Sequence, residues 1–368
     1  MAQRHKKRID IILALLIIGL VGFGLVMISS SSVVLSYEKY GNNYYYLTKQ
    51  FTSLLVGLVA MIVLTMLDYH VYKKLALFGL ISALVLLCLV LIPGVGKSLQ
   101  GASRWIHIGP IFFQPSELAK LAFLIYLAAW FDRKGNQVKS LFSGFLPFFG
   151  LVMLLAFLIL KQPDMGTAVV FVTSVFAVYF AAGAQIYHLV LSAALGISAF
   201  GTLIYTSSYR LDRLKVFLNA TDESSLGIGY HVKQIAIAIG SGGWLGLGFG
   251  ESRQKFLYLP EPFTDSIFAI SVEELGFFRA TLILAVFLLI AYRGYMVAKN
   301  APDNFGKYLA VGITTWLVVQ AFLNIGAMLG IIPLTGIPLP FLSYGGSSLV
   351  VTLAAAGILL NVSKQARN

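Results

Sequence analysis

Charged residues are scarce in this chain. Asp, Glu, Lys and Arg together make up 11% of its 368 residues, whereas soluble domains carry about 25%. Hydrophobic residues make up 58% of the chain. This composition argues against a soluble protein and indicates a chain that lies largely inside a lipid bilayer.

Cysteine is nearly absent as well. The single residue, Cys88, lies in the apolar run "ISALVLLCLVLI", so the chain has no intramolecular disulfide and no cysteine-based metal site. The Gly-rich stretch "AIGSGGWLGLGFGES" lacks the Gly-Lys-Ser/Thr ending of a phosphate-binding loop, which argues against nucleotide binding. The histidines are dispersed along the chain: His5, His70, His107, His188 and His231.

Long apolar runs are abundant. A bilayer core about 30 Å thick needs roughly 20 apolar residues per helix. About ten runs approach this length, and Lys120 interrupts the fourth. They cover residues 9–30, 51–67, 75–92, 115–131, 143–160, 167–183, 186–205, 266–292, 308–329 and 347–362. We therefore predict an all-α polytopic membrane protein with about ten transmembrane helices, forming a single domain over residues 1–368.

Basic residues outnumber acidic ones by 27 to 15, which gives a net charge of +12. In a membrane protein such residues first set the orientation, because cytoplasmic loops carry the excess of Lys and Arg. Nucleic acid is therefore not an expected partner. With the N-terminus inside, the cytoplasmic ends contain Arg4, Lys6, Lys7, Arg8, Lys73, Lys74, Arg133, Lys134, Lys139, Arg293, Lys299, Lys307, Lys364 and Arg367. We predict that both termini are cytoplasmic.

One long connection, residues 206–265, falls outside the membrane between spans seven and eight. Its basic residues are Arg210, Arg213, Lys215, Lys233, Arg253 and Lys255. Long loops escape the orientation rule, so this excess has two interpretations. These residues either meet solvent and lipid headgroups, or they form a basic rim that binds an anionic ligand.

Acidic residues occur at and inside the eighth span, in "LPEPFTDSIFAISVEELGFF". A carboxylate at the centre of a membrane helix costs about 2.5–3.5 kcal/mol, so such residues are functional candidates. Asp265, at the outer end of the span, could simply cap the helix, but Thr264 can cap it equally well and leave Asp265 for another role. On a helix that includes Asp265, Glu273 and Glu274 lie roughly 80° and 180° around the axis from it. We predict that these two glutamates hold the helix and the cavity.

Other polar groups lie on the same outer side. In "GASRWIHIGPIFFQPSELAKLAF" Arg104 precedes Glu117 and Lys120, whose three-residue spacing permits an ion pair on one helix face. Such a pair is either a structural tie or part of a site. "KQPDMGTA" places Gln162 and Asp164 in a short outer loop. "IPLPFLSYGGSSL" is a Pro-rich turn, and irregular backbone at membrane depth is tolerated only where it is buried or lines a cavity.

Six stretches, taken together and in this order, make the chain resemble the SEDS family (shape, elongation, division and sporulation), the polytopic FtsW and RodA proteins of bacteria. They are "GASRWI", "FQPSELAK", "QPDMGTA", "GYHVKQIAIAIGSGGWLGLGFG", "YLPEPFTDSIFAISVEELGF" and "IPLPFLSYGGSSL". The resemblance spans essentially the whole chain. Within the family, "ESRQKFLYLPE" looks closer to FtsW than to RodA.

The resemblance implies a peptidoglycan glycosyltransferase that polymerises lipid II on the outer face of the bacterial cytoplasmic membrane. The family's essential aspartate falls on Asp265, which is then the expected general base. The family's buried charged pair maps to Glu117 and Lys120, and its outer arginine and second outer aspartate map to Arg104 and Asp164. The candidates for substrate binding are Arg104, Glu117, Lys120, Gln162, Asp164, Arg210, Arg213, Lys215 and Ser343.

The related motif reads His-Thr-Asp-Phe, whereas this chain has Phe263, Thr264, Asp265 and Ser266, so the surroundings of the aspartate differ. A divalent cation, Mg²⁺ or Mn²⁺, is expected because hard cations bridge phosphate oxygens to carboxylates, and Asp265 is a possible ligand. The resemblance implies two kinds of partner. One is a class B penicillin-binding protein, which is a transpeptidase, and the other comprises further division or elongation proteins.

Two other functions remain open from the sequence. A lipid II flippase or another transporter also uses many helices with charges inside the membrane, but it is expected to show inverted repeats and broken helices at the midplane. The chain has no clear internal repeat, and its polar motifs gather on one side. A scaffold that binds a transpeptidase is the third interpretation, and it is compatible with catalysis.

Overall fold

The computed structural model describes residues 9–99, 102–108, 111–206, 208–218 and 227–366. The N-terminal half of these residues forms α1 (Ile11–Ser31), α2 (Val33–Tyr40), α3 (Tyr45–Met66), α4 (His70–Leu89), β1 (Gly96–Leu99), β2 (Ala102–Ile108), β3 (Ile111–Phe113), α5 (Pro115–Lys134), α6 (Leu146–Leu160) and α7 (Met165–Ala181). The C-terminal half forms α8 (Ile186–Tyr205), α9 (Ser208–Leu218), α10 (Ile228–Gly242), α11 (Ile267–Leu275), α12 (Phe277–Lys299), α13 (Asn304–Met328) and α14 (Gly346–Gln365). Two short helical turns, η1 (Gly135–Lys139) and η2 (Leu141–Phe145), connect α5 to α6.

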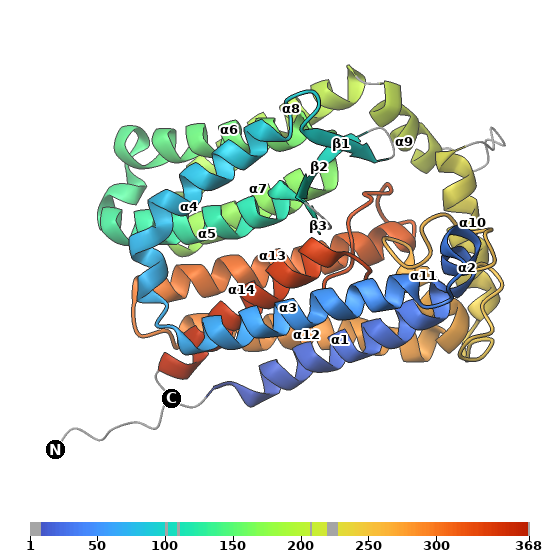
Figure 1. Cartoon of the computed structure of the whole chain (residues 1–368). Helices are drawn as coiled ribbons and strands as arrows, with labels where there is room; N and C mark the ends of the chain where they lie inside the picture. The colour runs from blue at the N-terminus through green and yellow to red at the C-terminus, as the bar shows by residue number, and fades with distance from the viewer. Residues whose placement is uncertain (1–8, 100–101, 109–110, 207, 219–226, 367–368) are drawn as a thin grey trace.

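The long helices run side by side, with α13 and α14 in the middle of the bundle (Figure 1). α14 packs against α3, and α13 packs against α7 and α12. Most of the residues of α13 and α14 are buried, whereas most of α8 is exposed. The centre of the fold is therefore built from the last two helices of the chain.

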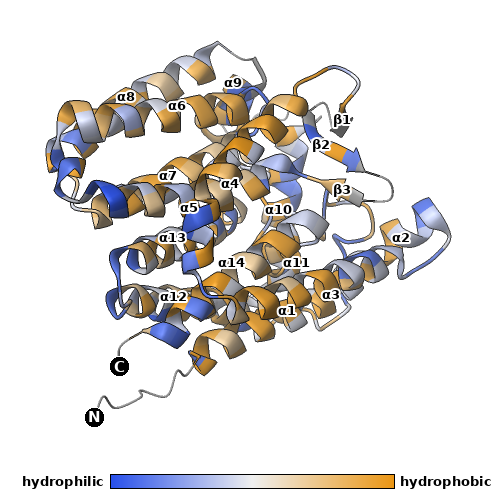
Figure 2. Cartoon of the chain, turned by 60° about the vertical axis from the view of Figure 1, so that its left-hand side comes forward, coloured by the Kyte–Doolittle hydropathy of each residue, from blue (hydrophilic) through white to orange (hydrophobic). Residues whose placement is uncertain are grey.

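Eight helices of the described chain are long and apolar enough to cross a membrane. The long helices are largely hydrophobic along their length (Figure 2), and many large Leu, Ile and Phe side chains are exposed. Together with helices of this length, such an extended apolar surface is typical of contact with lipid. The chain is a multi-pass helical membrane protein, and each of the ten predicted spans contains a helix.

Two of these helices fall short of the usual criteria for a span. α7 is apolar but has 17 residues, and α5 contains Glu117, Lys120 and a basic last turn. Both nevertheless pack inside the bundle, where α13 contacts each of them. The count of ten crossings stays a prediction.

The eighth predicted span is not one helix, so the prediction of a continuous run over residues 266–292 is wrong. It consists of α11 and α12, which are separated at Gly276 in a left-handed conformation (φ +82°). A Cβ atom at Gly276 would lie 2.3 Å from the backbone nitrogen of Gly246. The close approach of these two backbones requires glycine and turns the chain between the helices.

The long connection of residues 206–265 contains α9 and α10, and an antiparallel sheet in the order β1-β2-β3 precedes α5. The sequence analysis predicted no strands, so the sheet is an addition to an otherwise helical fold. The sheet, α9 and α10 lie at one end of the bundle, which we call the loop end (Figure 1).

The start of α1 and the end of α14 lie at the other end of the bundle (Figure 1), which we call the terminal end. The backbone nitrogen of Asp10 donates a hydrogen bond to Ser363 Oγ at 3.1 Å. Arg293 Nη2 lies 2.7 Å from Asp10 Oδ2. The start of α1 and the end of α14 are therefore held together at the terminal end, and the cytoplasmic location of both termini stays a prediction.

Candidate active site

Asp265 lies in a tight turn that precedes α11. The turn bends at Glu261, whose φ of +50° is left-handed. The backbone nitrogens of Thr264 and Ser266 both donate to the carbonyl oxygen of Glu261 at 3.3 Å. Ser266 is the N-cap residue of α11 and makes no side-chain cap. Asp265 is thus outside the helix and does not cap it, and the angles predicted for Glu273 and Glu274 relative to Asp265 do not apply.

A neighbouring loop fixes the turn from the other side. Asn324 in α13 donates from its Nδ2 atom to the carbonyl oxygen of Asp265 at 2.8 Å and to that of Ile337 at 2.8 Å. Tyr344 donates from its backbone nitrogen to the carbonyl oxygen of Phe263 at 2.8 Å. These bonds connect the turn to α13 and to the loop between α13 and α14 through backbone carbonyl groups, and none of them uses the Asp265 carboxylate.

The Asp265 side chain is enclosed but partly exposed. Thr264 Oγ1 lies 3.3 Å from Asp265 Oδ1 and 2.8 Å from Glu261 Oε2, so the two carboxylates are close neighbours. Burial, reinforced by the negative charge of Glu261, raises the pKa of Asp265 to about 7, and Arg213 opposes this shift. At neutral pH the carboxyl group therefore exchanges readily between its protonated and ionised forms.

Arg213 in α9 faces Asp265 across Gly336. A Cβ atom at Gly336 would lie 3.9 Å from both Arg213 Nη2 and Asp265 Oδ2. Gly336 is left-handed (φ +68°), and Arg213 Nη1 donates to the nearby carbonyl oxygen of Leu334 at 2.8 Å. No side chain of residue 336 separates the cation from the carboxylate, so a ligand that enters here can meet both charges.

Glu117 and Lys120 form the predicted ion pair in α5. Lys120 Nζ lies 2.9 Å from Glu117 Oε1, and both side chains are 2% exposed. Lys120 also donates to Gln320 Oε1 at 2.9 Å and lies 4.8 Å from the centre of the Trp316 ring. Gln320 Nε2 donates to the carbonyl oxygen of Pro338 at 2.9 Å. The buried pair therefore braces the same loop that carries Gly336.

The candidate residues Arg104, Gln162 and Asp164 lie around the loop between α6 and α7. Arg104 donates from Nε to the carbonyl oxygen of Gln162 at 2.9 Å and from Nη2 to that of Pro163. Asp164 caps α7 by accepting from the backbone nitrogen of Thr167 at 3.1 Å. The amide of the buried Gln162 side chain has no hydrogen-bond partner among the described residues. These contacts shape the loop between α6 and α7, and none of them involves Asp265.

The remaining candidates are spread over the loop end. Arg210 donates to the carbonyl oxygens of Leu203 at 3.1 Å and Leu160 at 3.4 Å. Lys215 is exposed on α9. Ser343 is buried, and its Oγ accepts from the backbone nitrogen of Leu339 at 2.8 Å. Of the three α9 residues predicted to form a basic rim, the structure places Arg213 beside Asp265.

Glu273 and Glu274, predicted to hold the helix and the cavity, bind the segment that follows α10 to α11. Glu273 Oε2 accepts from Ser252 Oγ at 2.5 Å, and its Oε1 accepts from the backbone nitrogen of Arg253 at 3.0 Å. Glu274 Oε1 lies 3.1 Å from Lys255 Nζ. Both carboxylates are fully buried. Glu274 Oε1 also accepts from Ser30 Oγ of α1 at 2.7 Å, while its Oε2 has no hydrogen-bond partner among the described residues. The ion pair and these hydrogen bonds offset much of the cost of placing two carboxylates inside an apolar run.

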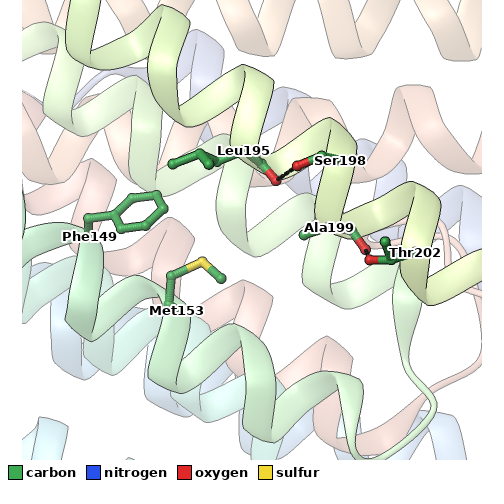
Figure 3. Close-up of a pocket in the computed structure, with 6 residues that line it drawn as sticks. All are labelled: Phe149, Met153, Leu195, Ser198, Ala199 and Thr202. Carbon is green, nitrogen blue, oxygen red and sulfur yellow. Dashed lines mark hydrogen bonds between the residues drawn. The ribbon is translucent and has the colours of Figure 1, made fainter.

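An open apolar groove lies between α6 and α8 (Figure 3). Its volume is about 330 Å³, and its lining residues are Phe149, Met153, Leu195, Ser198, Ala199 and Thr202. The Ser198 and Thr202 hydroxyls donate to carbonyl oxygens of their own helix, at 2.9 and 2.8 Å, so the groove presents hydrocarbon. A hydrocarbon chain of a lipid fits this lining.

Fold and site define a class: a polytopic helical membrane protein with a carboxylate and an arginine facing each other at one end of the bundle. The family model of the FtsW, RodA and SpoVE cell cycle proteins matches residues 10–368. The chain belongs to this family.

Relatives match the chain over nearly its whole length. The Stage V sporulation protein E of Bacillus subtilis is 42% identical over 362 residues, which are 98% of this chain and 99% of the relative. A protein of Trichlorobacter lovleyi named probable peptidoglycan glycosyltransferase FtsW is 40% identical, over 96% of this chain and 93% of the relative. The two identities are nearly equal, so the branch within the family stays a prediction.

Solved structures share the fold. A chain from a study of the structural coordination of polymerization and crosslinking by a peptidoglycan synthase complex has a TM-score of 0.79 and 29% identity, over 96% of this chain and 97% of the other. The rod shape determining protein RodA of Thermus thermophilus has a TM-score of 0.73 and 29% identity, over 98% of both chains.

Glu261, Asn324 and Gly336 belong to the site but were not among the residues predicted from the sequence. Glu261 stands four residues before Asp265 in a stretch already singled out, and Asn324 is a polar residue inside an apolar run, which is itself a signal. No sequence signal placed Gly336 or Arg213 beside Asp265, because α9 and the loop after α13 meet only in the folded chain.

Proposed function

We propose that this chain is a peptidoglycan glycosyltransferase that polymerises lipid II into glycan strands, with Asp265 as its general base. The main support is the environment of the Asp265 carboxyl group. Burial raises its pKa to about 7, and the group faces Arg213 across Gly336. A general base works best when its pKa lies near the operating pH. Membership of a family whose relatives are named peptidoglycan glycosyltransferases supports the choice of reaction.

The reaction joins two lipid-linked sugars. The ionised Asp265 takes the proton of the acceptor sugar hydroxyl while the hydroxyl oxygen attacks the anomeric carbon of the donor sugar. The bond from that carbon to the diphosphate oxygen breaks, and its electron pair leaves with the lipid diphosphate. Arg213 lies where it can stabilise this developing negative charge. The polymer then carries one more disaccharide, and the proton stays on Asp265 until solvent removes it.

A divalent cation fits the oxygen atoms next to this site. Asp265 and Glu261 share the Thr264 hydroxyl at 3.3 and 2.8 Å, and carboxylates and hydroxyls are the ligands that Mg²⁺ and Mn²⁺ prefer. Within the described residues no group of three or more His, Cys, Asp or Glu side chains could hold a metal. Glu261 and Asp265 would therefore hold the ion together with substrate phosphates. When bound, the ion would supply positive charge to the leaving diphosphate.

The site requires a particular placement in the cell. We place the loop end outside the cytoplasmic membrane, where lipid II is polymerised, and the terminal end in the cytoplasm. The apolar groove between α6 and α8 suits a polyprenyl chain by its lining. The partner proposed is a class B penicillin-binding protein. It is supported by the likeness to a chain from a peptidoglycan synthase complex that coordinates polymerization and crosslinking.

The test uses the purified full chain, alone and with a class B penicillin-binding protein, supplied with lipid II and Mn²⁺ in detergent. We expect long glycan strands and released undecaprenyl diphosphate, with more product when the partner is present. Liposomes containing labelled lipid II would report transport in the same preparation. Movement of lipid II across the bilayer without any glycan would overturn the proposal in favour of a flippase.

A further inference from the structure

Helix α10 delivers a histidine to the turn that carries Asp265. His231 Nε2 lies 2.8 Å from Ser266 Oγ, and Ser266 directly follows Asp265. The buried Ser266 hydroxyl also reaches the carbonyl oxygen of Pro260 at 3.3 Å. Ser266, which follows Asp265, is thus linked both to His231 of α10 and to Pro260, which lies before Asp265 in the chain.

The protons in this network have one consistent arrangement. Burial, with Arg213 adding to it, lowers the pKa of His231 to about 4, so the imidazole is neutral at pH 7 and carries a single N–H. The Ser266 hydroxyl has one proton and two neighbours within hydrogen-bond distance, His231 Nε2 and the carbonyl oxygen of Pro260. Both contacts are hydrogen bonds only if His231 donates to Ser266 Oγ and Ser266 donates to Pro260. The histidine then acts as a donor that fixes the direction of the serine hydroxyl.

Phe263, in the same turn, makes aromatic contacts instead. The Phe263 ring packs on Tyr46 and Tyr344, at 4.5 and 5.5 Å between ring centres. The Phe263 side chain therefore lies outside the hydrogen-bond network, whereas Ser266 offers a hydroxyl to an imidazole that comes from α10.

We propose that His231 is a positioning residue for Asp265: through Ser266 it closes the turn and keeps the carboxylate facing Arg213. The inference rests on the proposed function, because its main readout is glycan synthesis. The alternative is that the hydrogen bond of His231 only stabilises the packing of α10 and does not affect the reaction.

The test compares His231→Gln with His231→Met in the full chain with its partner. The two side chains have similar length and helix propensity, but Gln carries an N–H and Met does not. We expect His231→Met to lower kcat up to about 100-fold, the effect of a small misplacement of a catalytic group, with KM for lipid II nearly unchanged. His231→Gln should retain most of kcat, and His107→Ala, at an exposed histidine of β2, should retain all of it.

Ser266→Ala and the double variant His231→Met/Ser266→Ala complete the test. Since both residues act through one hydrogen bond, the double variant should lose no more kcat than either single variant. Thermal melting of each variant separates lost folding from lost rate. If folded His231→Met and His231→Gln are equally active or equally impaired, or if the losses add, the inference is wrong. A wild-type protein that makes no glycan would instead refute the proposed function.

Discussion

At Asp265 two nearby charges act in opposite directions. Glu261 raises the pKa of the carboxyl group and Arg213 lowers it, and burial adds to the effect of Glu261. Since a general base must be ionised, glycan synthesis should rise with pH, reach half of its maximum near pH 7 and level off about one pH unit higher. Glu261→Gln should move this rise to lower pH, and Arg213→Gln should move it to higher pH.

The measurement is kcat/KM for lipid II between pH 5 and 9 at constant Mn²⁺. Asp212→Asn, at an exposed aspartate one residue away from Arg213, is the matched control and should leave the profile in place. If the rise has the same midpoint in wild type, Glu261→Gln and Arg213→Gln, a group other than Asp265 titrates. Loss of metal affinity in Glu261→Gln is checked by repeating the series at higher Mn²⁺.

Gly336 keeps the space between Arg213 and Asp265 open. Gly336→Ala should cost about 1–2 kcal/mol, because residue 336 is left-handed, and it places a methyl group 3.9 Å from both charged groups. Gly330→Ala in the same loop carries the same backbone penalty (φ +69°) with no atom within 4 Å of the new methyl group. We expect similar losses of stability in thermal melts but a clear loss of kcat/KM in Gly336→Ala alone. Equal activity of the two variants would mean that substrate does not pass Gly336.

Individual residues were predictable where the sequence itself made them anomalous. Asp265, Glu117 and Lys120 are charges in or beside apolar runs, and that alone marked them. The proximity of Arg213 to Asp265 was not predictable. The two residues are far apart in the sequence, and α9 approaches the turn before α11 only through tertiary packing. For the same reason Arg210 and Lys215 could not be told apart from Arg213 beforehand.

At the scale of elements, the buried pair in α5 fixes how that helix meets its neighbours. Glu117 accepts from Ser348 at 3.3 Å and Lys120 donates to Gln320, so α5 is bound to both central helices. Removing one member of a buried pair typically costs about 3–5 kcal/mol, because the other charge is stranded.

Glu117→Gln and Lys120→Met should therefore each lower stability by about this amount. The double variant should lose clearly less than their sum, since it leaves no unpaired charge. The measurement is a double-mutant cycle of thermal or denaturant unfolding in detergent, with glycan synthesis followed in parallel. Additive losses would show that the pair is not a unit.

Helices were easier to predict than the breaks between them. An apolar run of the right length leaves little alternative to a helix in a bilayer. The break at Gly276 is different, because the residues on both sides are apolar and the turn is imposed by the segment that Glu273 and Glu274 bind. The small sheet before α5 was missed because β1 and β3 have four and three residues, too few to show an alternating pattern.

At the scale of the whole molecule, the account depends on which end of the bundle faces outwards. The chain has one cysteine, Cys88, so labelling requires little engineering. In a Cys88→Ala background, Lys215→Cys at the loop end should react with a membrane-impermeant maleimide in intact cells. Lys74→Cys at the start of α4 should react only after the membrane is opened. The reverse pattern would place Asp265 in the cytoplasm and exclude polymerisation outside.

The central claim is that Asp265 removes the proton of the acceptor sugar. Asp265→Asn keeps the size of the side chain and removes the basic oxygen. The measurement compares the rate of glycan synthesis by wild type, Asp265→Asn and Asp212→Asn, each purified with the proposed class B penicillin-binding protein and matched by thermal melt. We expect Asp265→Asn to fall by about 10²–10⁴-fold, the usual contribution of a general base, while Asp212→Asn stays at the wild-type rate. Long glycan made by Asp265→Asn at a rate close to that of wild type would contradict the account.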